Sequence, residues 1–144
     1  MRIDVLNGVN MNMLGRRDPS QYGSETLDDL ETTIYAWARE LGVQVRCRQT
    51  NHEGEYVEYI HASLDAADAL VLNPGAWTHY SWAIRDALEP FPGQTVEVHL
   101  SDVDKREDWR RHSVLEGLTA HRIAGKGFDG YHEALRWLVE AGAS

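Results

Sequence analysis

Short apolar runs alternate with longer amphipathic segments along this chain. Five runs rich in Val, Ile and Leu predict β-strands at residues 2–6, 43–49, 69–73, 95–100 and 121–125. In the intervening segments, apolar residues recur at intervals of three and four. This spacing predicts helices at residues 27–41, 55–67, 79–88 and 131–142. Strands and helices should therefore alternate along the chain.

The predicted helix 27–41 has one apolar face and recognisable ends. Thr26 precedes the first apolar residue and is a suitable N-cap, and Gly42 follows the last one and is a suitable end. The apolar face consists of Leu27, Leu30, Ile34, Trp37, Ala38 and Leu41. The predicted helix 131–142 directs a similar set inward, namely Tyr131, Ala134, Leu135, Leu138 and Val139. Both helices should pack one face against a sheet.

Alternating strands and helices predict right-handed βαβ units and a parallel sheet that is covered on both faces. We therefore expect an α/β fold, a flavodoxin-like, doubly wound, five-stranded parallel sheet with helices on both faces. At 144 residues, the chain is most simply one domain spanning residues 1–144.

Polar residues follow four of the five predicted strands. In an open parallel sheet, ligands bind outside the carboxyl ends of the strands. The strand ends carry Asn7-Gly8, Gln49-Thr50-Asn51-His52, Asn73-Pro74-Gly75 and His99-Leu100-Ser101. Asn and Gly can end a strand simply to form a turn, but turns alone account poorly for all four ends together. We expect these groups to converge on one crevice.

Composition and charge exclude several classes of protein. The hydrophobic fraction of 42% and the charged fraction of 26% are those of a soluble globular protein. No apolar run approaches the roughly 18 residues that a membrane helix needs, and residues 1–8 do not resemble a signal peptide. The lone Cys47 fits a reducing compartment, so we expect a cytoplasmic protein. A net charge of −9 argues against nucleic-acid and anionic-membrane partners.

The connection from residue 8 to about residue 25 is unusually long. Connections of this kind usually have about 2 to 6 residues, and long ones are often functional lids. Arg16, Arg17 and Tyr22 lie here between Gly15 and Gly23. A free tyrosine has a pKa near 10, and lowering it by about 3 units takes roughly 4 kcal/mol. One or two neighbouring guanidiniums could supply this. The alternative, equally supported by residue types alone, is a solvated loop with Tyr22 on the surface.

Four sequence blocks resemble one known family. "LNGVNMNMLGRRDPSQYG", "RQTNHEGEYVEYIH", "VLNPGAWTHYSWAIRDAL" and "VEVHLSDVDKREDWRRHS" are similar, in order and spacing, to the signature blocks of type II 3-dehydroquinate dehydratase. The blocks span residues 6–113. Because each block has several polar positions in place, the resemblance is specific.

The resemblance implies a reaction, an assembly and roles for individual residues. Members of this family convert 3-dehydroquinate to 3-dehydroshikimate and water through an enolate, without metal or organic cofactor. They have a flavodoxin-like fold and usually assemble as dodecamers of trimers. Tyr22 would be the base, Arg17 its activator, Asn10 the holder of a water that stabilises the enolate, and His99 the general acid. The remaining candidates would bind substrate: Asn73, His79, Arg110, Leu100, Ser101 and Asp86, the last in a neighbouring subunit's site.

The sequence departs from the family pattern at several positions. Val9 replaces the usual proline between two asparagines, and residues 114–126 follow the pattern only loosely. Trp77, Tyr80 and Trp82 are bulkier than usual and would fill a subunit contact or narrow the pocket.

Three other functions compete with this interpretation. A Schiff-base enzyme for the same reaction uses a TIM barrel of about 250 residues, which this chain is too short to form. A flavodoxin-like regulatory or small-ligand-binding module without catalysis is the second alternative. One regulatory kind, the phospho-acceptor receiver, needs acidic residues at the ends of the first and third strands, where Asn7 and Asn73 stand. A metal hydrolase needs histidine ligands at a spacing that is absent here. The dehydratase is the function that we expect.

Overall fold

A computed structural model describes residues 1–142 and contains one five-stranded parallel sheet. The strand order is β2-β1-β3-β4-β5, the flavodoxin-like order that the sequence predicts. The strands are β1 (Arg2–Asn7), β2 (Gln44–Gln49), β3 (Ala69–Asn73), β4 (Gln94–His99) and β5 (His121–Ala124). Each predicted strand is confirmed to within one residue at either end.

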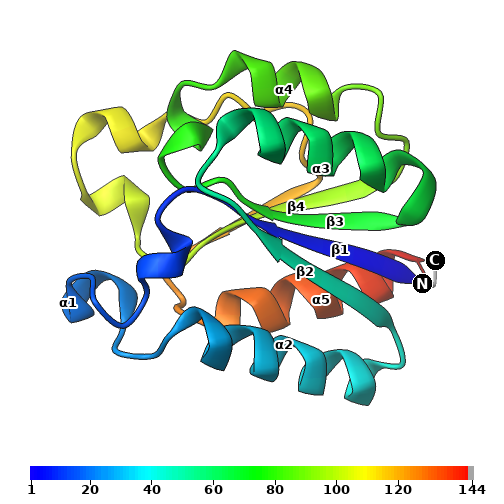
Figure 1. Ribbon diagram of the computed structural model, residues 1–144, viewed down its shortest axis with the longest axis horizontal. Coiled ribbons are helices and arrows are strands. Elements are labelled where there is room, and N and C mark those ends of the chain that lie inside the picture. Colours follow the sequence, from blue (N-terminus) through cyan, green and yellow to red (C-terminus); the bar gives the residue numbers. More distant parts are fainter. Residues whose placement is uncertain (143–144) are drawn as a thin grey trace.

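Two helices cover each face of the sheet (Figure 1). The helices α2 (Leu27–Leu41) and α5 (Asp129–Gly142) lie on one face, and α3 (Glu53–Ala66) and α4 (Trp82–Leu88) lie on the other. The short helix α1 (Pro19–Tyr22) lies at the carboxyl ends of the strands, as do four 3₁₀ helices. These 3₁₀ helices are Met11–Met13, Gly75–His79, Val103–Lys105 and Asp108–Arg111.

The predicted ends of α2 are confirmed in detail. The Thr26 hydroxyl accepts a hydrogen bond from the Asp29 backbone N–H at 3.2 Å, and the Asp29 carboxylate accepts one from the Thr26 N–H at 3.0 Å. This reciprocal pair satisfies two N–H groups that would otherwise lack partners. Gly42 ends the helix at a φ of 72°, a left-handed conformation that suits glycine.

The prediction for residues 79–88 is wrong at its first three positions. Residues Gly75–His79 form a separate 3₁₀ helix, and α4 begins only at Trp82. The Ser81 hydroxyl accepts a hydrogen bond from the Ile84 N–H and so caps α4. Two other helices begin two residues earlier than predicted, α3 at Glu53 and α5 at Asp129.

The sheet separates two hydrophobic cores, because alternate side chains of each strand point to opposite faces. Ile3, Val5, Val71 and Val98 pack beneath α2 and α5. Leu6, Leu70 and Leu72 pack beneath α3 and α4, together with Trp77. Trp77 is only 5% exposed, so this bulky departure from the family pattern fills the core.

The loops after β1 and β3 touch one another where the crevice was predicted. A Cβ on Gly8 would lie 2.3 Å from the Pro74 carbonyl oxygen, and one on Gly75 would lie 2.7 Å from the Val9 carbonyl oxygen. Gly75 also has a φ of 68°. Only glycine permits both the close approach and this backbone conformation. The two glycines therefore bring the polar ends of β1 and β3 into one site.

Candidate active site

A pocket at the carboxyl ends of β1, β3 and β4 brings together residues that are far apart in the sequence. Its volume of about 80 Å³ is enough for several water molecules. Of the candidate residues, Asn10, Arg17, Tyr22, Asn73, His79, His99, Leu100, Ser101 and Arg110 line it. Asp86 does not line this pocket and lies exposed on α4.

Tyr22 lies between two guanidinium groups. It is the last residue of α1, which begins where the Asp18 carboxylate accepts the Ser20 N–H. The Arg17 guanidinium carbon lies over the Tyr22 ring, 3.6 Å from its centroid. The phenolic oxygen accepts a hydrogen bond from Arg106 Nη1, and the same nitrogen lies 3.4 Å from the Ser101 hydroxyl oxygen. Two cations therefore contact this phenol, one at its face and one at its oxygen.

The pocket is locally positive although the chain carries a net charge of −9. Burial lowers the pKa of Arg17, the nearby Tyr22 raises it, and the charges of Arg106 and Arg110 lower it further. Arg110 pairs with the Glu107 carboxylate and lies over the Trp109 ring, 4.1 Å from its centroid. Arginine remains protonated under such crowding. A cluster of this kind favours an anionic ligand electrostatically.

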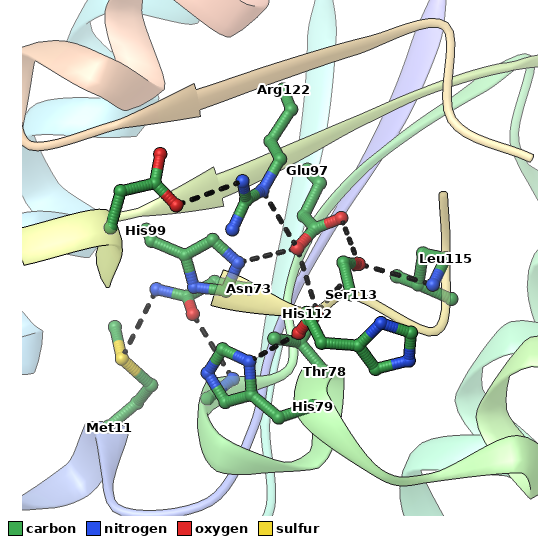
Figure 2. A network of polar contacts seen from close by, with 12 residues as sticks. Met11, Asn73, Thr78, His79, Glu97, His99, His112, Ser113, Leu115 and Arg122 are labelled. Atoms are coloured by element: carbon green, nitrogen blue, oxygen red, sulfur yellow. Dashed lines mark hydrogen bonds and ion pairs between the residues drawn. The ribbon is translucent and has the colours of Figure 1, made fainter. Parts of the chain in front are cut away.

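His99 is held by a buried carboxylate. Its Nε2 lies 2.6 Å from Oε2 of Glu97, and both side chains are almost fully buried. The same carboxylate accepts hydrogen bonds from the Thr78 hydroxyl at 2.7 Å and the Ser113 hydroxyl at 2.8 Å (Figure 2). Burial alone would raise the pKa of Glu97, but these partners outweigh it and hold the pKa well below its usual range. Glu97 is thus a fixed anion that orients the imidazole and leaves Nδ1 for a ligand.

His79 faces His99 across the pocket, with ring centroids 6.1 Å apart. Its Nδ1 lies 2.6 Å from the His112 carbonyl oxygen. A carbonyl can only accept, so Nδ1 carries the hydrogen and Nε2 is the acceptor. Burial lowers the pKa of His79, and His99 and Arg110 act in the same direction. A neutral His79 can therefore accept a hydrogen bond from a ligand hydroxyl.

Asn73 is fixed by a chain of buried polar groups. Its Oδ1 accepts the Gly75 N–H at 3.2 Å, and its Nδ2 donates to the Tyr131 hydroxyl at 2.9 Å and contacts Met11 Sδ at 3.4 Å. The Tyr131 hydroxyl donates in turn to Asn7 Oδ1 at 2.6 Å. These contacts determine the orientation of the amide, so the remaining lone pair of Oδ1 is what Asn73 offers a ligand.

Asn10 and the segment 100–101 complete the pocket wall. Asn10 has a φ of 69°, and its backbone N–H donates to Asn51 Oδ1 at 2.9 Å. Asparagine adopts this left-handed conformation more readily than other side-chain-bearing residues. The carbonyls of Leu100 and Ser101 accept hydrogen bonds from the N–H groups of Gly127 and Gly125. Both segments are therefore fixed by backbone contacts.

Comparison with known proteins decides the family. The family model described as dehydroquinase class II matches residues 1–139. The chain belongs to the class II dehydroquinase family.

Relatives and solved structures agree with this membership. A 3-dehydroquinate dehydratase of Pelobacter propionicus is 51% identical over 135 residues, which cover 93% of this chain and 91% of the relative. The type II dehydroquinase structure from Butyrivibrio crossotus has a TM-score of 0.93 and 41% identity, covering 96% of this chain and 97% of the other. The corresponding structure from Propionibacterium acnes also has a TM-score of 0.93, with 44% identity and 96% coverage of each chain.

The sequence analysis of this class II dehydroquinase missed several polar residues of the site. Arg106 lies in an irregular segment whose path no periodicity reveals. Glu97, in contrast, stands two residues before His99 on a predicted strand. Residues at this spacing share one face of a strand, so their pairing could have been predicted. Thr78 and Ser113 were missed because their contact with Glu97 depends on tertiary packing.

Neither a metal-binding cluster nor a membrane-spanning helix is found in the described part of the chain. Within residues 1–142 of this class II dehydroquinase, no group of three or more His, Cys, Asp or Glu side chains is arranged to hold a metal ion. In the same part of the chain, every helix is too short or too polar to span a bilayer.

Proposed function

We propose that this chain removes water from 3-dehydroquinate to give 3-dehydroshikimate, through an enolate and without a cofactor. Membership of the class II dehydroquinase family supports this function. One observation carries the assignment of residues: a phenol contacted by two guanidiniums and a histidine paired with a buried carboxylate line the same small pocket. The first group suits a base, and the second suits an acid.

Tyr22 would act as the base that removes the proton next to the ketone. A general base typically contributes about 10²–10⁴-fold to the rate of such a step. The phenolate form of Tyr22 would be stabilised by the charge-assisted hydrogen bond from Arg106 and by the Arg17 guanidinium over the ring. Arg17 would thus share the activating role with Arg106, which extends the assignment made from the sequence.

The enolate that forms needs hydrogen-bond donors that are in place before its charge develops. Asn10 would hold a water molecule for this purpose. Its side-chain amide lines the pocket, while its backbone is held by Asn51 and by the left-handed turn. The guanidiniums of the pocket would add a favourable electrostatic potential for the growing negative charge.

His99 would protonate the departing hydroxyl. Hydroxide is a poor leaving group, so an acid must supply a proton as the carbon–oxygen bond breaks. With Nε2 directed at Glu97, Nδ1 is the ring nitrogen that can donate to the substrate. Glu97 stabilises the protonated ring and keeps it in this orientation.

The remaining residues of the pocket would bind the substrate. His79 and Asn73 offer acceptors to its hydroxyl groups, and Arg110 offers donors. The segment Leu100–Ser101 would bind the carboxylate through backbone N–H groups and the Ser101 hydroxyl. The positive charge of the three arginines, which a metabolite carboxylate would offset, supports this placement.

We also propose a homo-oligomer, a dodecamer built from trimers, in which Asp86 reaches the site of a neighbouring subunit. Two observations support a subunit interface that includes α4. Asp86 lies on α4 outside its own pocket, and the nearby Tyr80 and Trp82 are 58% and 60% exposed. Large aromatic side chains that are exposed close together are typical of contact surfaces.

A direct assay tests the proposed activity. When 3-dehydroquinate is added to the purified protein, ultraviolet absorbance should rise because the product has a conjugated double bond. Addition of EDTA should leave the rate unchanged, and borohydride added with substrate should not inactivate the protein. No absorbance change at any substrate concentration would refute the activity. Permanent inactivation by borohydride would instead indicate a Schiff base on a lysine.

A further inference from the structure

Glu97 has a fourth neighbour that the proposed reaction leaves unused. Across the β4–β5 ladder, Glu97 stands directly opposite Arg122. Side chains paired in this way lie on the same face of the sheet. Arg122 Nε lies 3.6 Å from Glu97 Oε2, the oxygen that also contacts His99 Nε2. Figure 2 shows dashed lines from one oxygen of the Glu97 carboxylate to both the His99 ring and the Arg122 guanidinium.

Arg122 is partly buried, and two of its three guanidinium nitrogens lack the hydrogen bonds that usually accompany burial. Nε and Nη2 are buried and have no hydrogen-bond partner within the described part of the chain. The third nitrogen, Nη1, lies 3.8 Å from an oxygen of Asp104. Buried donors without acceptors are unfavourable for folding. The charged partners found for Arg122 are Glu97 and Asp104, so its effect on Glu97 is electrostatic.

We propose that Arg122 is a positioning residue for the dehydration: its charge offsets that of Glu97 and thereby keeps His99 a stronger proton donor. The proposal rests on the role of His99 as the acid. A carboxylate beside a histidine stabilises the protonated ring and so makes it a weaker acid. When a cation offsets part of the carboxylate charge, the protonated ring gives up its proton more easily. Glu97 can then orient His99 without holding its proton too tightly.

Asp104 faces this pair through its contact with Arg122 Nη1, and other charged or titratable groups also lie around it. Those on the pocket side are His79, Arg17, Tyr22, Arg106 and Arg110. On the opposite side, Tyr56 of α3 interacts electrostatically with Glu97. A second pocket, behind Glu97, is lined by Arg111, Glu116, His121 and Arg122 itself. Among these groups, Arg122 is the cation for which an ion pair with Glu97 is found.

Replacement of Arg122 by methionine removes the charge and retains an unbranched apolar stem. We expect the His99 ring in Arg122→Met to keep its proton to a pH about one unit higher, as measured by NMR titration of the imidazole without substrate. We expect kcat to fall about tenfold because the acid is weaker, with KM changed less than twofold. Arg122→Lys retains the charge. In this variant, the His99 titration and kcat should therefore stay close to their wild-type values.

Arg111→Met is the matched control, since it removes another arginine of the second pocket. Arg111 pairs with Asp108 at 3.9 Å and donates to the Asp104 carbonyl. Within residues 1–142, no ion pair or hydrogen bond between Arg111 and Glu97 is found. We expect Arg111→Met to show the same His99 titration and the same dehydration kinetics as the wild-type protein. An unchanged His99 titration in Arg122→Met would overturn the inference, as would equal shifts in the two methionine variants.

Two further outcomes separate a structural role from the proposed one. If Arg122→Met does not fold, Arg122→Lys and Arg122→Gln are compared, and equal titration of His99 in both would refute a charge effect. If the wild-type protein shows no dehydration while His99 titrates as expected, the proposed function fails and the electrostatic effect of Arg122 stands. Normal dehydration with no effect of Arg122 refutes only the inference.

Discussion

Arg106 Nη1 donates a hydrogen bond to the phenolic oxygen of Tyr22 across 84 positions of sequence. Tyr22 ends α1 in the long connection after β1, and Arg106 follows a 3₁₀ helix beyond β4. The contact joins the two irregular segments that border the pocket. It also places a permanent positive charge at the oxygen that would remove the substrate proton.

Replacement of Tyr22 by phenylalanine removes the proposed base and little else. We expect kcat to fall about 10²–10⁴-fold, while the free energy of unfolding changes by about 1 kcal/mol through loss of one hydrogen bond. Steady-state kinetics and circular dichroism measure the two effects. Tyr59→Phe is the matched control, because Tyr59 also has a guanidinium over its ring, that of Arg48 at 5.0 Å, but lies outside the pocket. Near-normal turnover in Tyr22→Phe would exclude Tyr22 as the base.

Removal of either guanidinium at Tyr22 should slow the reaction. A charge-assisted hydrogen bond contributes about 1.5–3 kcal/mol, so we expect Arg106→Ala to lower kcat/KM about 10- to 100-fold. The loss should be larger at low pH, because the phenol then keeps its proton more easily. Arg17→Ala should act in the same direction. Arg16→Ala is the control, since Arg16 is exposed and does not line the pocket. Equal losses at Arg16 and Arg17 would contradict the assignment.

The ionised Glu97 should stabilise the fold in a pH-dependent way. Although burial works against ionisation, hydrogen bonds from His99, Thr78 and Ser113 lower the pKa of Glu97 in the folded protein. A carboxyl group with a lowered folded-state pKa stabilises the protein above its unfolded pKa of about 4.3, and this contribution is lost as the pH falls through the folded value. Urea unfolding from pH 6 downward should therefore show a steeper loss of stability below about pH 4 in the wild type than in Glu97→Gln. Parallel curves would show that Glu97 is not ionised in the folded state.

Subunit complementation tests the proposed role of Asp86. Asp86→Ala should lower activity although Asp86 does not line the pocket of its own subunit. Tyr22→Phe should also lower activity. If Asp86 serves a neighbouring site, mixed oligomers contain some sites with both residues intact, and unfolding and refolding the two variants together should restore part of the activity. Light scattering of each sample measures the size of the oligomer. Failure of the mixture to exceed its components would place Asp86 outside the reaction.

The sequence predicts the fold well because strand and helix periodicities are strong local signals here. Both faces of the sheet are covered, so the central strands β1 (RIDVLN) and β3 (ALVLN) are largely apolar, and α2 carries its own capping residues at Thr26 and Asp29. The signal fails at residues 79–81, where His79 ends the 3₁₀ helix Gly75–His79 and Ser81 caps α4. Apolar spacing alone does not show that α4 begins only at Trp82.

The candidate site could be predicted only where its residues follow strands or form part of a motif. Asn73 and His99 were identifiable because strand ends meet at one edge of a sheet. Arg106 and Arg122 were not, since their positions depend on irregular segments and on the pairing of β4 with β5. Contacts of this kind depend on the tertiary fold, so no local pattern of residues shows them.

Ionisation of Tyr22 is the step on which the proposed chemistry depends. The most direct measurement is the ultraviolet difference spectrum between the wild-type protein and Tyr22→Phe, recorded as a function of pH alongside the rate of dehydration. We predict a phenolate absorbance from Tyr22 throughout the pH range in which the protein is active. A phenol that ionises only near pH 10, as in free tyrosine, while dehydration proceeds at neutral pH, would contradict this chemistry.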